Sequence, residues 1–230
     1  MGVLRKGLSG NFLKLIALIT MTVDHIGHIL LPQYLILRVI GRLAFPIYAY
    51  MIAEGCHHTK NKAAYLGTVA GVGLACQLVY FITMRSMFLC ILITFSLSIA
   101  MIYLLENAEK RDGFLPWLLV AAGLLVLLFL CVFLPWLLPG TDYGIDYGLV
   151  GILLPVLVYV GRDREERLFL MAVGLVLLAI NYGGIQWYAL AALPLLTLYN
   201  GKRGSWKLKW LFYVYYPLHL AALQMIALLR

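Results

Sequence analysis

The apolar residues of this chain fall into nine runs, separated by breaks that are charged or rich in turn-forming residues. A transmembrane helix needs about 20 such residues, and most of the runs approach or exceed that length. The sixth to eighth runs have only 13 to 15 residues. They would make about 20 Å of helix against a hydrocarbon core of about 30 Å, so we expect broken helices or a re-entrant pair there. The predicted segments are residues 12–31, 34–53, 63–84, 87–105, 114–138, 148–160, 168–180, 185–199 and 209–229.

The composition excludes a water-soluble domain. Hydrophobic residues make up 63% of the 230 positions and charged residues 12%, whereas soluble chains carry about 25% charged residues. We therefore predict an all-α polytopic transmembrane helix bundle, formed as a single domain by residues 1–230. No small-residue cleavage site follows the first apolar run, so we expect the first helix to be retained. The scattered cysteines are expected to be buried thiols, with no disulfide or metal site: Cys56, Cys76, Cys90 and Cys131.

The basic residues predict the orientation, because cytoplasmic loops hold an excess of Lys and Arg. With the N-terminus inside, the outer segments hold only Arg85 and Arg230, together with the acidic loop TDYGIDYG at residues 141–148. We therefore predict a cytoplasmic N-terminus and an external C-terminus. The inner segments then hold thirteen bases, namely Arg5, Lys6, Lys60, Lys62, Lys110, Arg111, Arg162, Arg164, Arg167, Lys202, Arg203, Lys207 and Lys209.

Five ionisable residues lie close together in sequence within the first two segments, where Asp or Arg at the helix centre costs at least about 2.5–3.5 kcal/mol. Asp24, His25 and His28 lie in the first segment and Arg38 and Arg42 in the second. The connector is about two residues long, so the helices should be antiparallel neighbours with the carboxylate level with one arginine. A buried bridge that locks the hairpin is one interpretation. The surplus of one arginine and two histidines favours a functional site.

Two further polar groups interrupt apolar sequence. Glu54, His57 and His58 share a helical face at the inner end of the second segment. Metal binding is one interpretation of this group, but Cys56 lies on another face and no fourth ligand is evident, so we predict an interfacial patch or part of a ligand mouth, without metal. His219 stands near mid-membrane in FYVYYPLHL, where neighbouring tyrosines supply polar companions. A lone histidine there is usually a satisfied bundle residue.

These residues carry a family resemblance. The segments KLIALITMTVDHIGHILLP, LRVIGRLAFPIYAYMIAEGCHHTKN, DYGLVGILLP, ALPLLTLYNGKRG and FYVYYPLHL follow the order and spacing of the TraX family, which the chain resembles over nearly its whole length. The family's namesake acetylates the N-terminus of conjugative pilin. TraX-like proteins are in turn similar to integral-membrane acyltransferases of bacterial inner membranes, many of which have a basic residue, ten intervening positions and then a histidine. Lys14 and His25 have that spacing, so the resemblance implies that His25 is the active-site histidine. Asp24 and Arg42 fall on positions that are typical of TraX-like sequences.

The resemblance implies acetyl transfer from cytoplasmic acetyl-CoA to an amine or hydroxyl outside. Such a transfer needs a proton acceptor, for which histidine with a carboxylate is suited, and a cation for the oxyanion, for which arginine is suited. Asp24 and His25 are about 100° apart on a helix, so we expect Asp24 to orient His28 or pair with Arg42 while His25 faces the substrate. The candidate catalytic residues are Asp24, His25, His28, Arg38 and Arg42.

The remaining candidates are assigned by side of the membrane. Each assignment has a structural alternative. The inner bases are also explained by the ordinary excess of positive charge in cytoplasmic loops, and the acidic loop at residues 141–148 is also explained by turn geometry and helix capping. The expected co-substrate is acetyl-CoA without metal, and the expected partners are a peptide N-terminus, amino compound or glycan, and the lipid bilayer, but no nucleic acid. A proton-coupled transporter and a noncatalytic assembly protein are the alternatives. Candidate donor-binding residues are Lys14, Glu54, His57, His58, Lys60, Lys202 and Arg203, with Lys62, Lys207 and Lys209 as further inner bases, and candidate acceptor-binding residues are Asp142, Asp146, Tyr147 and His219.

Overall fold

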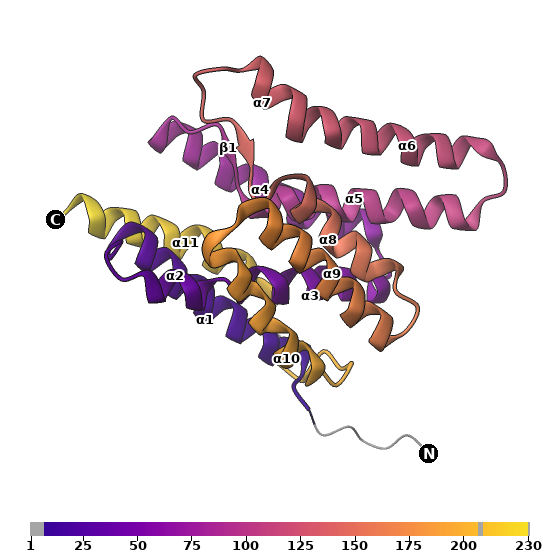
Figure 1. Cartoon of the computed structure of the whole chain (residues 1–230), viewed down its shortest axis with the longest axis horizontal. Coiled ribbons are helices and arrows are strands. Elements are labelled where there is room, and N and C mark those ends of the chain that lie inside the picture. The colour runs from indigo at the N-terminus through magenta and orange to yellow at the C-terminus, as the bar shows by residue number, and fades with distance from the viewer. Residues whose placement is uncertain (1–6, 207–208, 230) are drawn as a thin grey trace. The chain divides into compact units, whose positions relative to one another are not determined.

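The fold is predominantly helical, as the sequence predicts. The computed structural model describes residues 7–206 and 209–229, so Arg5, Lys6, Lys207 and Arg230 of the charge count lie outside the described residues. Figure 1 labels most of the elements. They are α1 (Gly10–Ile29), α2 (Leu35–Gly41), α3 (Ala44–His58), α4 (Lys62–Met84), β1 (Phe88–Leu89), α5 (Ile91–Lys110), α6 (Phe114–Leu128), the π-helix η1 (Phe129–Phe133), α7 (Leu134–Leu137), β2 (Gly144–Ile145), α8 (Gly148–Val160), α9 (Arg164–Tyr182), the 3₁₀-helix η2 (Gly184–Ala191), α10 (Ala192–Thr197) and α11 (Lys209–Leu228).

Five helical stretches of the described residues are long and apolar enough to cross a membrane, which supports a membrane protein. Side chains along α6 and α7 are largely exposed, including Phe114, Leu125 and Trp136, as expected of a helix whose surface faces lipid. The candidate spans are Gly10–Ile29, Leu35–His58, Lys62–Ile82, Ile91–Lys110 and Phe114–Leu137, and the shorter apolar helices are Gly148–Val160 and Val214–Leu228.

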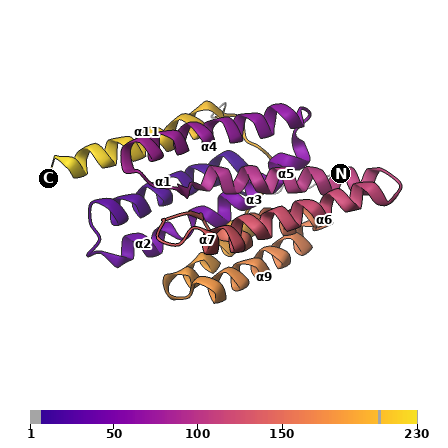
Figure 2. The same cartoon turned by 90° about the horizontal axis from the view of Figure 1, so that it is seen from above.

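The chain forms two compact units, which are described separately. Unit 1 contains the chain up to Met51 and from Arg162 onward, and unit 2 contains Ile52–Gly161. In unit 1, α1 packs along α2 and α11 (Figure 2). The start of α1 is closed by the loop after α10, since the backbone N–H groups of Gly10 and Asn11 donate to the carbonyls of Lys202 and Arg203 at 2.8 and 2.9 Å.

The second predicted segment is broken at Arg42 and Leu43, between α2 and α3. Pro46 follows four residues after Arg42 and has no N–H to donate to the Arg42 carbonyl, so a continuous helix would leave that group unpaired. The N–H groups of Arg42 and Leu43 instead bond three residues back, to Val39 and Ile40. The Arg38 carbonyl, released by this shift, accepts from Arg42 Nε at 3.2 Å. The break therefore holds the Arg42 side chain along the helix axis.

The eighth predicted segment is not a regular membrane helix. The structure has the 3₁₀-helix η2 followed by the short helix α10, which is the broken form that the sequence left open. Gly183 and Gly184 both have positive φ, 64° and 50°, a conformation that ends an α-helix and favours glycine. The seventh segment is longer than predicted, because the Asp163 side chain caps α9 by accepting from Glu166 N at 2.8 Å.

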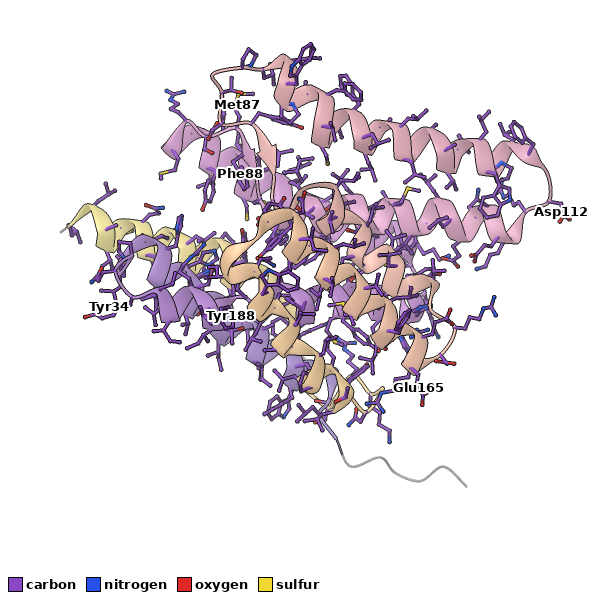
Figure 3. All side chains as sticks on the ribbon, in the orientation of Figure 1. Tyr34, Met87, Phe88, Asp112, Glu165 and Tyr188 are labelled. Atoms are coloured by element: carbon purple, nitrogen blue, oxygen red, sulfur yellow. The ribbon has the colours of Figure 1, made fainter. Side chains whose placement is uncertain are left out.

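In unit 2, α5 packs against α4, α6 and α8. The side chains of Thr94 and Ser98 are fully buried on α5, and small polar residues of this kind let membrane helices approach closely. Ser98 Oγ donates to the Ile152 carbonyl of α8 at 2.7 Å. The turn between α4 and α5, where Met87 and Phe88 lie, pairs through β1 with β2 as a parallel two-residue ladder (Figure 3).

Candidate functional site

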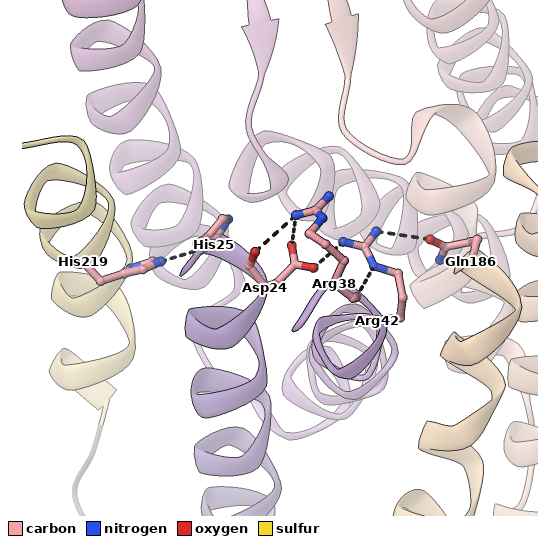
Figure 4. Close-up of polar contacts among 6 residues, drawn as sticks. All are labelled: Asp24, His25, Arg38, Arg42, Gln186 and His219. Carbon is pink, nitrogen blue, oxygen red and sulfur yellow. Dashed lines mark hydrogen bonds and ion pairs between the residues drawn. The ribbon is translucent and has the colours of Figure 1, made fainter. Parts of the chain in front are cut away.

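Asp24 is the centre of an ion network between α1 and α2. Its Oδ2 accepts from Arg38 Nη1 at 2.7 Å and its Oδ1 from Arg42 Nη2 at 2.6 Å (Figure 4). The side chains of Asp24 and Arg42 are 13% and 12% exposed, and that of Arg38 is 25% exposed. The sequence placed the carboxylate level with one arginine, and the structure places it against both. One carboxylate against two guanidinium groups leaves one net positive charge at this site.

Two glycines permit this close approach of α1 and α2. A Cβ added to Gly41 would lie 2.2 Å from the side chain of Asp24, and one added to Gly27 would lie 2.7 Å from Cβ of Leu37. Both distances are shorter than real Cβ contacts, so only glycine fits at these positions. The carboxylate is therefore packed against the backbone of α2.

The expected link from Asp24 to His28 is not the one formed. Both carboxylate oxygens are used by the arginines, and His28 is exposed near the end of α1. The sequence predicted either His28 or Arg42 as the partner of Asp24, and of these two the structure shows Arg42. Arg38 uses only Nη1, so within the described residues its Nε and Nη2 make no hydrogen bond. These N–H groups are spare donors beside the network.

Gln186 belongs to this network, and the sequence analysis missed it. Its Oε1 accepts from Arg42 Nη1 at 3.4 Å, and the residue is only 5% exposed. That bond fixes the orientation of the amide, and Nε2 is buried with no partner among the described residues. An unsatisfied buried donor costs about 1–3 kcal/mol. The signal that could have found Gln186 is an uncharged amide inside an apolar run, which is weaker than the charges that drew attention to Asp24.

His25 faces α11 instead of α2. Its Nδ1 lies 2.9 Å from Nε2 of His219 (Figure 4). His219 Nδ1 in turn lies 2.8 Å from the backbone carbonyl of Tyr215. The Tyr215 ring stacks on the His219 ring at 5.0 Å, and its hydroxyl lies 2.9 Å from Thr22 Oγ1. The sequence placed His219 among acceptor-binding residues, and the structure brings it into contact with His25. It is 8% exposed.

Lys14 and His25 lie on the same face of α1. The helix is uninterrupted from Gly10 to Ile29, and eleven residues make about three turns, so the two side chains are about 16 Å apart along the axis and only about 20° apart around it. Lys14 Nζ lies 6.0 Å from the centre of the Phe212 ring on α11. The basic residue and the histidine therefore both face α11.

Two of the other predicted donor-binding residues gather near the start of α1. Lys202 and Arg203 are exposed in the loop that closes the helix, and the charge of Arg203 acts on that of Lys14. The first N–H groups of the helix are already used by the carbonyls of this loop. An anion bound here would therefore rely on the three side-chain cations.

The remaining donor-binding candidates lie in unit 2, so a joint donor site with Lys14 stays a prediction. Glu54 is buried, with 9% exposure, and its carbonyl lies 2.9 Å from His58 Nδ1. His57 stacks on Tyr159 with the ring centres 4.1 Å apart. Lys60 is exposed after α3, whereas Lys62 pairs with Glu106 at 2.5 Å.

The acidic loop also lies in unit 2, where it is attached to the turn between α4 and α5. Asp142 Oδ1 accepts from Met87 N at 2.8 Å, and hydrogen bonds from Ser86 and Met87 hold the pKa of this exposed carboxyl below its usual value. Its charge is thus present at neutral pH. Asp146 is held through its backbone, to Leu89 O at 3.0 Å and Thr94 Oγ1 at 2.8 Å.

Tyr147 precedes α8 with a left-handed backbone, φ 58°, and its side chain makes no capping bond. The role of this loop in binding an acceptor stays a prediction.

Comparison with known proteins identifies the family. The chain matches the family described as TraX protein over residues 9–227. It is 28% identical over 237 aligned residues to the probable fimbrial assembly protein FimC, serogroup H1, of Dichelobacter nodosus, covering 92% of each chain. It is 29% identical over 228 residues to Protein TraX of Escherichia coli, covering 95% of this chain and 87% of that one.

An uncharacterized protein of Rickettsia prowazekii (strain Madrid E) is 27% identical over 159 residues, which are 69% of this chain and 58% of the relative. No solved structure gives a significant match. The family match covers nearly all of the sequence, including every candidate residue described above. The chain therefore belongs to the TraX family.

Proposed function

We propose that this protein is a membrane-embedded acetyltransferase, which moves an acetyl group from cytoplasmic acetyl-CoA to an amine or hydroxyl of an acceptor outside the cytoplasm. The observation that carries the proposal is the arrangement around α1 in unit 1, with a histidine pair on one side and a net positive network of Asp24, Arg38 and Arg42 on the other. A base and a cation are the two groups that acyl transfer requires. Membership of the TraX family supports the same reaction.

His25 is the proposed base. The acceptor amine, which has first lost its ammonium proton to water, attacks the thioester carbonyl carbon while a second proton passes to the imidazole of His25, so that an N–C bond forms and an N–H bond breaks. The C–S bond then breaks, and the CoA thiolate takes the proton from His25. Proton transfer by a positioned side chain contributes about 10²–10⁴ to the rate. A hydroxyl acceptor follows the same steps.

The cationic network supports the charge that develops on the carbonyl oxygen. Asp24 cannot neutralise both arginines, so one positive charge remains, and Arg38 keeps spare N–H groups. Asp24 acts by holding the two guanidinium groups in place, not as the base. Nε2 of Gln186, which has no partner within residues 7–206 and 209–229, adds a donor for a ligand oxygen next to Arg42. Fixed donors of this kind each contribute about 10²–10³ in kcat in other enzymes.

The donor enters at the start of α1, where Lys14 lies on the helix and Lys202 and Arg203 lie in the loop that closes it. These cations suit the phosphates of CoA. The extended pantetheine arm would span the distance of about 16 Å from Lys14 to His25 along α1. The thioester would then reach the histidine from the cytoplasmic side. The orientation in the bacterial inner membrane follows the predicted charge asymmetry, with the N-terminus inside.

The acceptor comes from the other side. The name of the relative FimC refers to fimbrial assembly, which makes the N-terminus of a surface-filament subunit the first acceptor to test. An amine of this kind is cationic before it reacts, and the charges of Asp142 and Asp146 would attract it.

The test is acetyl transfer by the purified protein in lipid nanodiscs, with acetyl-CoA and a synthetic peptide that has a free N-terminus. Free thiol and acetylated peptide should form in equal amounts, and the same peptide with a blocked N-terminus should give neither. His25→Ala should lower the rate at least about 100-fold, whereas Gln33→Ala in the exposed connector should not change it. Uptake of a small molecule into vesicles without thiol release would overturn the proposal in favour of a proton-coupled transporter.

A further inference from the structure

The histidine pair between α1 and α11 defines its own protonation pattern. A neutral imidazole has one nitrogen that donates and one that accepts. The Tyr215 carbonyl can only accept, and it lies 2.8 Å from His219 Nδ1, so Nδ1 of His219 carries the proton. Nε2 of His219 then has the lone pair.

The lone pair of His219 determines the tautomer of His25. Its Nδ1 lies 2.9 Å from Nε2 of His219, which is now an acceptor, so Nδ1 of His25 must carry a proton. In neutral His25 the lone pair is therefore on Nε2. The Tyr215 carbonyl thus determines, through His219, which nitrogen of His25 can act as a base, although His25 and His219 are 194 positions apart in the chain.

His219 is held in this position by several contacts. Its ring stacks on Tyr215 with planes 12° apart. Thr22 Oγ1 donates to the Leu18 carbonyl at 2.8 Å, so its oxygen accepts from the Tyr215 hydroxyl, which ties α11 to α1 at this level. The ring of Tyr216 lies edge-on to both histidines, at 6.4 Å from His25 and 5.7 Å from His219. Little rotation of the His219 ring is possible without loss of these contacts.

We propose that His219 is a positioning residue, which fixes the proton of His25 on Nδ1 and so presents Nε2 of His25 as the base toward the acceptor. This inference rests on the proposed function for its catalytic part. When His25 takes the acceptor's proton on Nε2, its Nδ1–H continues to donate to His219, whose lone pair stabilises the imidazolium. The proton then leaves from Nε2 to the CoA thiolate, and the pair returns to its starting state.

This arrangement differs from a histidine held by a carboxylate. Asp24 is next to His25 in sequence, but its oxygens are used by Arg38 and Arg42. The orienting partner of His25 is thus a second imidazole, which carries no charge in its neutral form. Loss of the tautomer-fixing partner lowers kcat about 10⁴-fold in serine proteases, where that partner is charged.

The first experiment measures the tautomer directly, without need of activity. The wild-type protein, labelled with ¹⁵N-histidine and held in nanodiscs, is examined by NMR, because a ring nitrogen with a proton and one with a lone pair give well-separated signals. The signals of His25 and His219 are assigned by their loss in single variants. Both residues should carry the proton on Nδ1. A neutral His25 with its proton on Nε2 would overturn the inference, whether or not the protein transfers acetyl groups.

The second experiment measures kinetics with acetyl-CoA and the free-N-terminus peptide. His219→Phe should lower kcat at least about 100-fold while the KM for acetyl-CoA stays within about threefold. His219→Gln puts an amide oxygen near the position of Nε2, so it should keep the tautomer and recover at least about tenfold of that loss. Leu218→Phe, an exposed neighbour on the same helix, is the matched control and should behave as wild type.

The two failures are distinguishable. A wild-type protein that transfers no acetyl group removes the proposed function but leaves the tautomer measurement intact. An active wild type with an equally active His219→Phe overturns the positioning role. A His219→Gln variant that is folded but no better than His219→Phe also overturns it, because an acceptor at that position would then be irrelevant.

Discussion

Asparagine at position 24 would leave two guanidinium groups facing each other without the carboxylate between them. Removing one partner of a buried ion pair costs about 3–5 kcal/mol, and each charge-assisted hydrogen bond lost is worth about 1.5–3 kcal/mol. The Arg42 pair is almost buried, whereas Arg38 is 25% exposed and retains some solvent. We therefore expect Asp24→Asn to lower the free energy of unfolding by about 3 kcal/mol, the lower end of that range.

The assay is unfolding by SDS in mixed micelles, followed by circular dichroism, for four proteins: wild type, Asp24→Asn, Arg42→Gln and the double variant. Arg42→Gln leaves Asp24 paired with Arg38, so it should cost less than Asp24→Asn. The double variant removes the repulsion between the two arginines, and should be more stable than the two single losses predict, by about 1–3 kcal/mol. Additive losses, or a loss below about 1 kcal/mol for Asp24→Asn, would refute the network as the source of stability.

Turnover measured on the same preparations separates stability from catalysis. If Asp24 only locks the hairpin, the protein that remains folded should keep near-normal turnover. If it holds the arginines for the reaction, folded Asp24→Asn should lose at least about 100-fold. The buried thiols of Cys56, Cys76 and Cys90 should keep the background low when released CoA is measured with a thiol reagent.

Three further outcomes are expected. Gly41→Ala should lose about 1–3 kcal/mol, because its Cβ would lie 2.2 Å from a side chain of α1, whereas Gly67→Ala, with no atom within 4 Å, should be neutral or slightly stabilising; equal stability of the two would contradict the close packing. Asp142→Asn with Asp146→Asn keeps an acceptor oxygen for Met87 N but removes the charge, so the KM for an amine acceptor should rise several-fold and lose salt dependence; an unchanged KM would leave only a structural turn. Reporter fusions after Arg111 should read as cytoplasmic and fusions within residues 141–148 as external; the reverse pattern would exchange the donor and acceptor sides.

The long apolar runs could be predicted from the sequence because length and hydropathy are sufficient for a membrane helix. The prediction for 148–160 coincides with α8. The segment at 185–199 could not be resolved, since an apolar run of that length is compatible with several backbones. The positive φ of Gly183 and Gly184 decides in favour of a 3₁₀-helix, and this in turn brings Gln186 to Arg42.

The pairing of Asp24 with arginine could be predicted from the sequence, because the two helices are joined by a short connector and helices joined in this way have a limited set of alignments. The pairing of His25 with His219 could not, because nothing in the sequence relates the first apolar run to the last. Gly41 likewise gave no signal before the structure showed the carboxylate against it. Local spacing predicts which residues share a face, but only packing determines which face of another helix they meet.

The spacing of Lys14 and His25 illustrates both parts of this argument. In the sequence, a basic residue separated from a histidine by ten positions is only a family pattern. On a continuous helix it becomes three turns, so any element that packs along this face meets both residues. Phe212 and His219 on α11 are seven residues apart, or about two turns, and contact Lys14 and His25 respectively. The helix that would line the path of the donor is therefore the same one that supplies the partner of the proposed base, so a change in the packing of α11 would affect both.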